Sequence, residues 1–455
     1  MKRVEASLPE FGALVRERAR EIAPPELRRT VAGIVDAVRA RGDAALCEFT
    51  RQFDHYALEP RHLRLSAKEL AVNVPATLRK ALQQAMASVR AYHRRQLRQD
   101  WTAANSAGAE TGEIFRPVER AGMYIPAGTA PLVSTVLMTV IPAQVAGVKE
   151  ICVASPPGPD GALSPGILAA CRACGINEVY RMGGAQAIAA LAFGTETVKR
   201  VDVIAGPGNR YVTEAKRQVF GYVGIDLLAG PSESMIIADL SANPAFVAAD
   251  LLSQAEHHQS STYLVAISGL FLDEVEAHLS ALLTTRFTSR ELQRAVAERV
   301  VAVHAASLDQ AAQVANLIAP EHLQIVTEHD DDVLRKIRHA GAIFLGHYAP
   351  VPLGDYVAGP SHVLPTGGTA RYMSGLSTDV FRKRMAVMRF SPAAFARTAS
   401  AIKSFAAYEC LPAHGYVVEV RARKARAGDS TLGIRRLGRS RKAQGQKKRT
   451  ADISS

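Results

Sequence analysis

The sequence predicts an α/β protein in which parallel sheets are covered by helices. From about residue 120 onward, short apolar runs alternate with segments whose apolar residues recur at helical spacing, the pattern of strand–helix units. Glycine-bearing turns follow several of these runs. The 455 residues, 48% hydrophobic and 22% charged, are enough for two or more domains with a sizeable core.

Helical segments are expected before this alternating region. Residues 1–25 predict an N-terminal helical arm that ends at Pro24-Pro25. Two further stretches, Leu27 to Phe53 and Ala67 to Gln99, repeat Leu, Val and Ala at helical spacing.

Eight short apolar runs are predicted to be strands because helical segments and turn residues separate them. They are 123–125, 151–154, 179–180, 201–204, 235–238, 263–266, 323–326 and 342–345.

The positive charge of the chain is concentrated at its end. From Arg421 onward, twelve Lys and Arg residues face two Asp residues, so the rest carries +2 of the total net charge of +12. Segment 421–455 lacks apolar periodicity and predicts a disordered basic tail. Such a tail could contact nucleic acid or stay solvated. The nearly neutral body favours the second alternative, so nucleic acid is not expected as a partner.

Composition also bears on location and cysteine chemistry. Five cysteines do not predict a disulfide framework, and Cys171 with Cys174 is expected to supply small buried residues of a helix. No apolar run reaches the roughly 18 residues of a membrane span. The N-terminus lacks the apolar core of a signal peptide. We therefore expect a cytoplasmic protein with no membrane partner.

Three glycine-bearing turns lie in the first part of the alternating region. They are 125–132, Gly183-Gly184-Ala185-Gln186 and Gly206-Pro207-Gly208-Asn209. Backbone N–H groups at such turns, with a following helix N-terminus, can bind phosphate. None has the GxGxxG spacing. A dinucleotide site and a set of ordinary turns both remain open.

A polar cluster, Ser253-Gln254-Ala255-Glu256-His257-His258, closes a helix predicted to begin near Pro244. Gln254 and His257 are three residues apart and share one helix face. An amide oxygen and an imidazole nitrogen could bind a divalent metal together with ligands from elsewhere. An ordinary polar helix end is the alternative.

Other candidate residues lie later in the chain. Glu321-His322 offers two proton acceptors near neutral pH. The Gly- and Pro-rich loop 354–368 contains Asp355, an oxygen ligand or a turn former, and such loops often carry function. The segment 409–414 precedes residues 417–420, predicted as a strand.

Together these motifs resemble those of the histidinol dehydrogenase family. They occur in the family's order over about residues 28–420, with Tyr124-Ile125-Pro126-Ala127-Gly128-Thr129-Ala130-Pro131 and Gly230-Pro231-Ser232-Glu233 among them. The set is far more specific than any one motif.

The resemblance implies a role for each matching residue. Zinc ligands match Gln254, His257, Asp355 and His414; acid–base residues match Glu321 and His322; NAD contacts match Tyr124, Gln186 and Asn209. Substrate-binding positions match Ser232, His362 and Glu409, together with the zinc ligands and His322.

The resemblance also implies an architecture of incomplete Rossmann-like parallel-sheet domains with helical N- and C-terminal segments. Its domains would be the arm 1–25, a first α/β domain (26–118 and 233–375), an NAD-binding domain (119–232) and a C-terminal segment (376–420) before the tail. The family is a domain-swapped homodimer, so the segment 376–420 would supply Glu409 and His414 to the partner subunit's active site.

The implied activity is zinc-dependent oxidation of L-histidinol through bound L-histidinal to L-histidine with two NAD, the last step of histidine biosynthesis. The sequence departs from the family at Ser234, His258, Ser361 and Cys410, where Cys410 replaces a usual Gly. These departures leave a second function open, oxidation of another polar alcohol such as a sulfonated propanediol.

Overall fold

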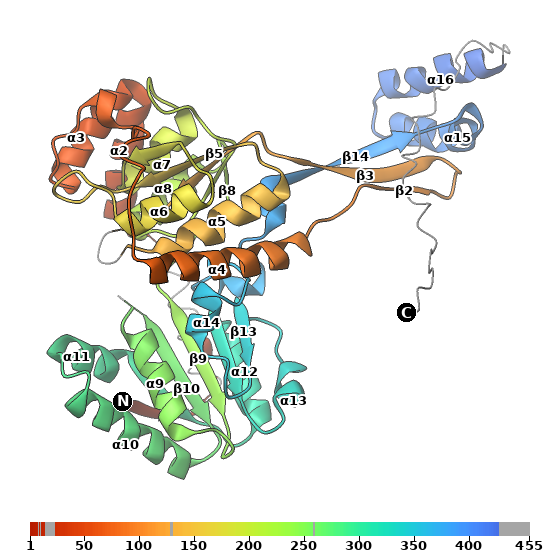
Figure 1. Cartoon of the computed structure of the whole chain (residues 1–455). Helices are drawn as coiled ribbons and strands as arrows, with labels where there is room; N and C mark the ends of the chain where they lie inside the picture. Colours follow the sequence, from red (N-terminus) through yellow and green to blue (C-terminus); the bar gives the residue numbers. More distant parts are fainter. Residues whose placement is uncertain (8, 10, 14–22, 128–130, 258–259, 427–455) are drawn as a thin grey trace, which may run out of the picture. The chain divides into compact units, whose positions relative to one another are not determined.

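The computed structural model describes residues 1–7, 9, 11–13, 23–127, 131–257 and 260–426 (Figure 1). The chain divides into two compact units. The first comprises residues 1–99 and 115–384, and the second residues 100–114 and 385–455. In the part of the chain that is described, no helix has both the length and the apolar character needed to cross a membrane.

The first unit contains a six-stranded sheet whose pairings are all parallel. In spatial order its strands are β1 (Lys2–Glu5), β11 (Val300–His304), β10 (Ser261–Ala266), β9 (Glu233–Ala238), β12 (His322–Val326) and β13 (Ala342–Leu345). Successive side chains of a strand point to opposite faces, and the apolar runs therefore feed two separate cores.

Helices cover both faces of this sheet, as buried parallel sheets require (Figure 1). One core includes α9 (Pro244–Ala255), α10 (Gly269–Thr285) and α11 (Arg290–Arg299). The other includes α12 (Leu308–Ile318) and α13 (Asp330–Leu334). Helix α14 (Val351–Tyr356) follows β13.

The second sheet of this unit has five parallel strands. Its strands, in spatial order, are β6 (Val179–Arg181), β5 (Glu150–Ser155), β4 (Arg120–Tyr124), β7 (Val203–Ala205) and β8 (Gly224–Ile225).

This sheet also separates two cores. One contains side chains of α4 (Ala76–Arg94), α5 (Val133–Ala146) and α6 (Pro165–Ala173). The other contains side chains of α2 (Pro25–Arg41), α3 (Asp43–Phe53), α7 (Gly184–Phe193) and α8 (Arg210–Val219). Cys171 and Cys174 are buried, as expected.

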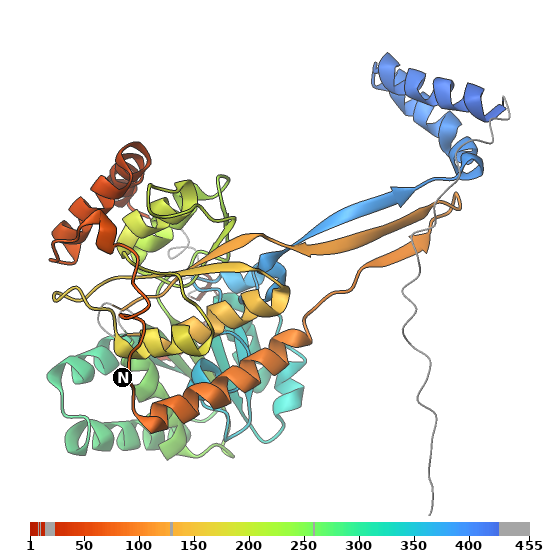
Figure 2. The same ribbon diagram turned by 45° about the horizontal axis from the view of Figure 1, so that its top comes forward.

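The second unit is built on a three-stranded sheet with the order β14-β3-β2. These strands are β2 (Trp101–Ala104), β3 (Glu110–Pro117) and β14 (Arg382–Arg389), and the last two begin or end in the first unit. In Figure 2 the blue strand leads into two helices, α15 (Pro392–Tyr408) and α16 (Pro412–Arg426). Short 3-10 turns occur at Pro60–His62, Thr369–Arg371 and Thr378–Phe381.

The observed elements confirm the predicted α/β class and the eight predicted strands. The prediction of one helical stretch from Leu27 to Phe53 was nearly right, but Gly42, with φ 54°, separates two helices. Within the predicted stretch 67–99, the helix is shorter and spans Ala76–Arg94.

Two local predictions were wrong. Residues 2–5 were assigned to a helical arm but form β1, because pairing with β11 outweighs a weak local pattern. Residues 417–420 were predicted as a strand but lie inside α16, which also takes in the start of the predicted tail. A run of four apolar residues cannot by itself distinguish strand from helix.

The predicted domain boundaries remain predictions. Both parallel sheets fall in one compact unit, and the observed division instead separates residues 100–114 and 385–455. The hairpin β2–β3 gave no clear sequence signal. All four residues of β2 are exposed, so the strand lacks the alternation of buried apolar and exposed polar residues that marks a half-buried strand.

Candidate active site

Glu321 and His322 form a buried pair at the amino end of β12. The register places His322 between Ser234 of β9 and Ala342 of β13, so neighbours flank it on both sides. Glu321 is 7% exposed and His322 6% exposed. Oε2 of Glu321 lies 3.7 Å from Nδ1 of His322. A carboxyl and an imidazole are therefore held side by side away from water.

Helix α9 brings two more predicted residues to the same edge of the sheet. Asn243 caps the helix by accepting a backbone hydrogen bond, and Pro244 occupies its first turn. Because β9 and β10 are parallel, the helix that joins them runs back toward the amino ends of the strands. Its carboxyl end therefore carries Gln254 and His257 toward the buried pair.

Asp355, near the end of α14, also lies beside the pair. Its Oδ1 lies 4.0 Å from Nε2 of His322. The ring of Phe344 lies 6.0 Å, centroid to centroid, from the His322 ring. A Cβ at Gly354 would lie 2.7 Å from the Phe344 ring, so glycine lets α14 approach β13 closely. This contact sets the position of the neighbouring Asp355.

His362 contacts Asp355 through the backbone. Nδ1 of His362 lies 3.1 Å from the Asp355 carbonyl oxygen. Its Nε2 lies 3.0 Å from Oγ1 of Thr135, a residue of α5. His362 therefore joins the six-stranded-sheet site to a helix of the five-stranded sheet.

Burial shifts the pKa values of the pair in opposite directions. It raises the pKa of Glu321 to about 8, with the charges of Glu233 and Asp355 adding to the effect. It lowers the pKa of His322 to about 3, with smaller contributions from His257 and His362. At neutral pH the imidazole is neutral and the carboxyl is largely protonated.

The surrounding groups are shifted for the same reason. Burial raises the pKa of Asp355 to about 6 and lowers the pKa of His362 to about 4. Perturbed pKa values that gather in one cluster of side chains are typical of a functional site.

Residues 232–233 tie the pair to the later loop. The backbone N–H of Glu233 donates to Oε2 of Glu321 at 3.3 Å, and Ser232 also hydrogen-bonds that carboxyl. The carboxylate of Glu233 accepts from the N–H groups of Gly367 at 3.0 Å and Gly368 at 3.4 Å. The start of β9 thus fixes both the predicted base and the turn that follows His362.

The three predicted NAD residues gather at the carboxyl edge of the five-stranded sheet. Tyr124 ends β4, and its hydroxyl accepts from the N–H of Gly184 at 3.1 Å. Gln186 lies in the first turn of α7 and is 1% exposed. Neither amide atom of Gln186 has a hydrogen-bond partner among the residues that the structure describes. Ligands of parallel sheets bind at this edge.

Hydrogen bonds and close backbone packing fix Asn209 and the turn before it. Asn209 caps α8 by accepting from two backbone N–H groups. A Cβ at Gly206, where φ is 121°, would lie 2.1 Å from the Tyr124 carbonyl oxygen, so only glycine fits there. The buried Lys216 and Asp226 form an ion pair and bond the two backbone groups of Gly206.

Glu409 and His414 belong to the second unit. Glu409 follows α15, and His414 lies in the first turn of α16. Both are exposed. Cys410, between the two helices, has φ 55°, a left-handed conformation that glycine adopts more easily. This conformation explains why glycine is expected at this position.

The residues of the first unit fit a divalent cation. An amide oxygen, an imidazole nitrogen and a carboxylate suit zinc, and the half-buried carboxylate of Asp355 lies 4.0 Å from His322. Among the described residues, no group of three or more His, Cys, Asp or Glu side chains is arranged to hold a metal. The first unit contributes only two predicted ligands of these types, His257 and Asp355, because the third, Gln254, is an amide.

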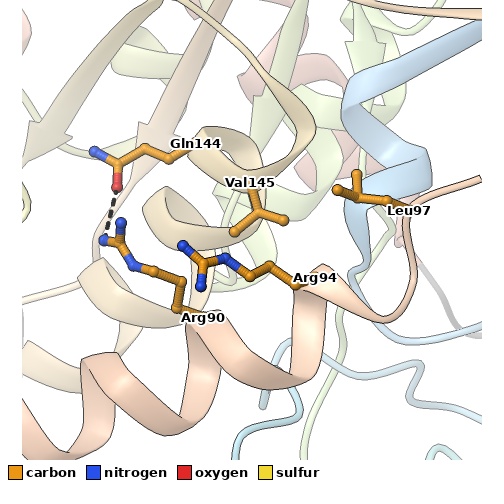
Figure 3. A pocket seen from close by; sticks show the side chains of 5 residues that line it. All are labelled: Arg90, Arg94, Leu97, Gln144 and Val145. Carbon is orange, nitrogen blue, oxygen red and sulfur yellow. Dashed lines mark hydrogen bonds between the residues drawn. The ribbon is translucent and has the colours of Figure 1, made fainter. Parts of the chain in front are cut away.

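A hollow of about 240 Å³ lies elsewhere, between α4 and α5 (Figure 3). Arg90, Arg94 and Leu97 line it from one side, and Gln144 and Val145 from the other; Arg90 donates to Gln144 at 3.5 Å. None of the residues that line this hollow is a predicted residue of the candidate active site. Part of the turn 125–132, and His258, lie outside the described residues.

Sequence reasoning missed three residues of the site. Thr135 lies in an apolar helix, Phe344 in an apolar run, and Glu233 was noted only within a motif. Two threonines four residues apart in a buried helix, Thr135 and Thr139, were a signal that could have been noticed.

A model of the histidinol dehydrogenase family matches residues 17–422. The chain belongs to the histidinol dehydrogenase family. Relatives named histidinol dehydrogenase include one from Synechococcus sp., 45% identical over 409 residues, covering 89% of this chain and 94% of the relative. One from Bacillus subtilis is 44% identical over 411 residues, with 90% and 96% covered.

A crystal structure of histidinol dehydrogenase from Elizabethkingia anophelis has the same fold. It superposes with a TM-score of 0.87 at 35% identity and covers 94% of this chain and 99% of that chain. These histidinol dehydrogenases confirm the resemblance and the α/β architecture. The role of each site residue stays a prediction.

The raised pKa of Glu321 predicts a pH-dependent stability difference. Folding favours the protonated form of this carboxyl. Its ionisation therefore lowers the free energy of unfolding as the pH rises from the pKa in the unfolded chain, about 4.5, to the pKa in the folded protein, about 8. Glu321→Gln cannot ionise. Relative to this variant, the wild type should lose free energy of unfolding between pH 5 and pH 8, measured by urea unfolding. A difference that stays constant with pH would contradict the assignment.

Proposed function

We propose that the protein oxidises L-histidinol to L-histidine with two NAD molecules, the last step of histidine biosynthesis. The single observation that carries this proposal is the buried Glu321–His322 pair, whose pKa values are shifted in opposite directions. The 44–45% identity to proteins named histidinol dehydrogenase over about nine-tenths of the chain supports it. A cytoplasmic location is part of the same proposal.

His322 is the proposed acceptor of the alcohol proton. Its low pKa keeps the ring neutral at neutral pH, so a lone pair is free to take a proton as hydride leaves the carbon. Its Nδ1 is buried and has no hydrogen-bond partner among the described residues. Oxidation of the alcohol to the aldehyde removes two electrons, and the same residue can serve again in the second oxidation.

Glu321 is the proposed group that activates water. The intermediate aldehyde must add one water before the second hydride can leave, and a carboxylate next to the site can take the proton of that water. A pKa of about 8 lets Glu321 release and take up protons near neutral pH. Overall, one alcohol, one water and two NAD give one carboxylate, two NADH and protons.

Separate groups of residues are proposed to bind the two cofactors, zinc and NAD. We propose that Gln254, His257, Asp355 and His414 hold zinc and that Tyr124, Gln186 and Asn209 contact NAD. When bound, NAD accepts the hydride, and zinc holds and orients the substrate. Two observations support these assignments: the amide of Gln186 has no hydrogen-bond partner among the described residues, and the half-buried carboxyl of Asp355 lies beside His322.

A second copy of the chain is proposed to complete each site. Glu409 and His414 are exposed on the second unit, where α15 and α16 also expose large apolar side chains, including Phe405 at 67% and Tyr408 at 91%. Exposed apolar clusters of this kind mark association surfaces. We propose a homodimer in which Ser232, His322 and His362 of one subunit and Glu409 and His414 of the partner bind the same substrate.

The decisive test is the stoichiometry of the reaction. Zinc-loaded protein with L-histidinol and NAD should form two NADH for each L-histidine, because alcohol-to-acid oxidation removes four electrons. Absorbance at the NADH band and chromatography of the product measure the two quantities. Absence of turnover with NAD bound would reject histidinol and favour another polar alcohol.

Removing the proposed proton acceptor should reduce turnover. His322→Ala is expected to lower kcat by about 10²- to 10⁴-fold, the usual contribution of a positioned acid or base. The measurement is steady-state NADH formation at saturating substrate. The matched control is His304→Ala, which removes a more exposed imidazole from β11 of the same sheet and should leave kcat unchanged. Intact turnover in His322→Ala would reject the role.

Mixed dimers test the shared site. Glu321→Gln and His414→Ala chains should each be inactive alone. After unfolding, mixing and refolding, heterodimers would contain one site with both substitutions and one with neither, so activity should return to roughly a quarter of the wild-type value for random pairing. If no activity returned while heterodimers were present, His414 would act within its own chain and the shared site would be wrong.

A further inference from the structure

Both ring nitrogens of His362 are already engaged within the protein. Nδ1 lies 3.1 Å from the backbone carbonyl oxygen of Asp355, and Nε2 lies 3.0 Å from Oγ1 of Thr135. These two partners come from different parts of the first unit: α14, which follows β13, and α5, which follows β4. The ring is therefore held at both ends.

The chemistry of the partners fixes the tautomer. A carbonyl oxygen can only accept, so Nδ1 must carry the proton and donate to Asp355. The imidazole of histidine is mostly neutral above its ordinary pKa of about 6.5, so above that pH the ring carries a single proton. Nε2 then holds a lone pair, and the Thr135 hydroxyl must be the donor in this contact.

With a single lone pair, Nε2 can accept one hydrogen bond at a time. Asp355, whose carbonyl oxygen bonds Nδ1, has its carboxylate 4.0 Å from Nε2 of His322, so the His362 ring lies beside the site of the proposed chemistry. A substrate group that bonds Nε2 must be a donor, and it must take the position now held by the Thr135 hydroxyl. Histidinol has such donors in its hydroxyl and ammonium groups.

Thr135 differs in this respect from the threonine one helical turn later. The Thr139 hydroxyl donates to the Thr135 carbonyl oxygen at 2.7 Å, a bond within its own helix. Both residues are fully buried. The hydroxyl of Thr135 therefore reaches out of α5 to the site, whereas that of Thr139 stays in the helix.

We propose that the Thr135 hydroxyl donates to Nε2 of His362 in the free enzyme and that a hydroxyl or ammonium donor of the substrate replaces it on binding. This proposal rests on the proposed function. Part of the substrate's binding energy is then used to break the Thr135–His362 hydrogen bond, so Thr135 weakens substrate binding while it stabilises the empty site.

The test compares hydroxyl-free and hydroxyl-bearing variants. Thr135→Val keeps the shape but leaves Nε2 unpaired in the free enzyme, and a buried unpaired acceptor is costly. The Kd of L-histidinol for the zinc-loaded enzyme without NAD, measured by calorimetry, should fall by about tenfold. Thr135→Ser retains the donor and should bind as the wild type does. Thr139→Val, the matched control, should also leave Kd unchanged.

The outcomes separate this proposal from the proposed function. If the wild type binds and oxidises L-histidinol but Thr135→Val binds it equally or more weakly, the exchange is wrong and the function stands. If the wild type does not bind L-histidinol, the function and the exchange both fail. Thr135→Ala, which also lacks the hydroxyl, gives the same comparison if Thr135→Val does not fold.

Discussion

Removal of the Glu321–His322 pair from water is the constraint on which the site depends. A carboxyl and an imidazole in contact would normally form an ion pair at neutral pH. Here burial disfavours both charged forms, raising the pKa of Glu321 to about 8 and lowering that of His322 to about 3. At neutral pH both members of the pair are therefore mostly uncharged, and the flanking strands β9 and β13 impose the burial that keeps them so.

The predicted acid–base pair and the predicted NAD residues lie at opposite edges of their respective sheets. The buried pair lies at the amino end of β12, whereas Tyr124 lies at the carboxyl end of β4 and the turn at Gly206 follows β7. Helix α9 returns to the same amino edge before β10 begins, which brings Gln254 and His257 there. The Thr135–His362 contact links the two regions directly.

The second unit carries its predicted ligands on an exposed, partly apolar surface. Helices α15 and α16 pack on each other through few buried residues, among them Ala406 and Val418. Such a small helical pair cannot bury much apolar surface by itself. The proposal that a second copy covers it therefore follows from the same energetic requirement that shapes the rest of the fold.

Much of this protein could be predicted from sequence. Apolar runs such as 235–238 and 263–266 identified the strands because a buried parallel strand needs a continuous apolar sequence. Asn243-Pro244 marked the start of α9 because capping is a local interaction. The motifs around Gln254, Glu321 and Asp355 named most of the candidate site, since family resemblance preserves order along the chain.

The sequence by itself determined the α/β class, the family and the residue types available for chemistry, all of which depend on local pattern. Tertiary structure alone decided that residues 2–5 join a sheet and that residues 417–420 are helical, because pairing and packing override short patterns. It alone decided the pKa values of the buried pair and the partner of His362, because burial and contacts between Thr135 and a residue 227 positions away arise only when the chain has folded.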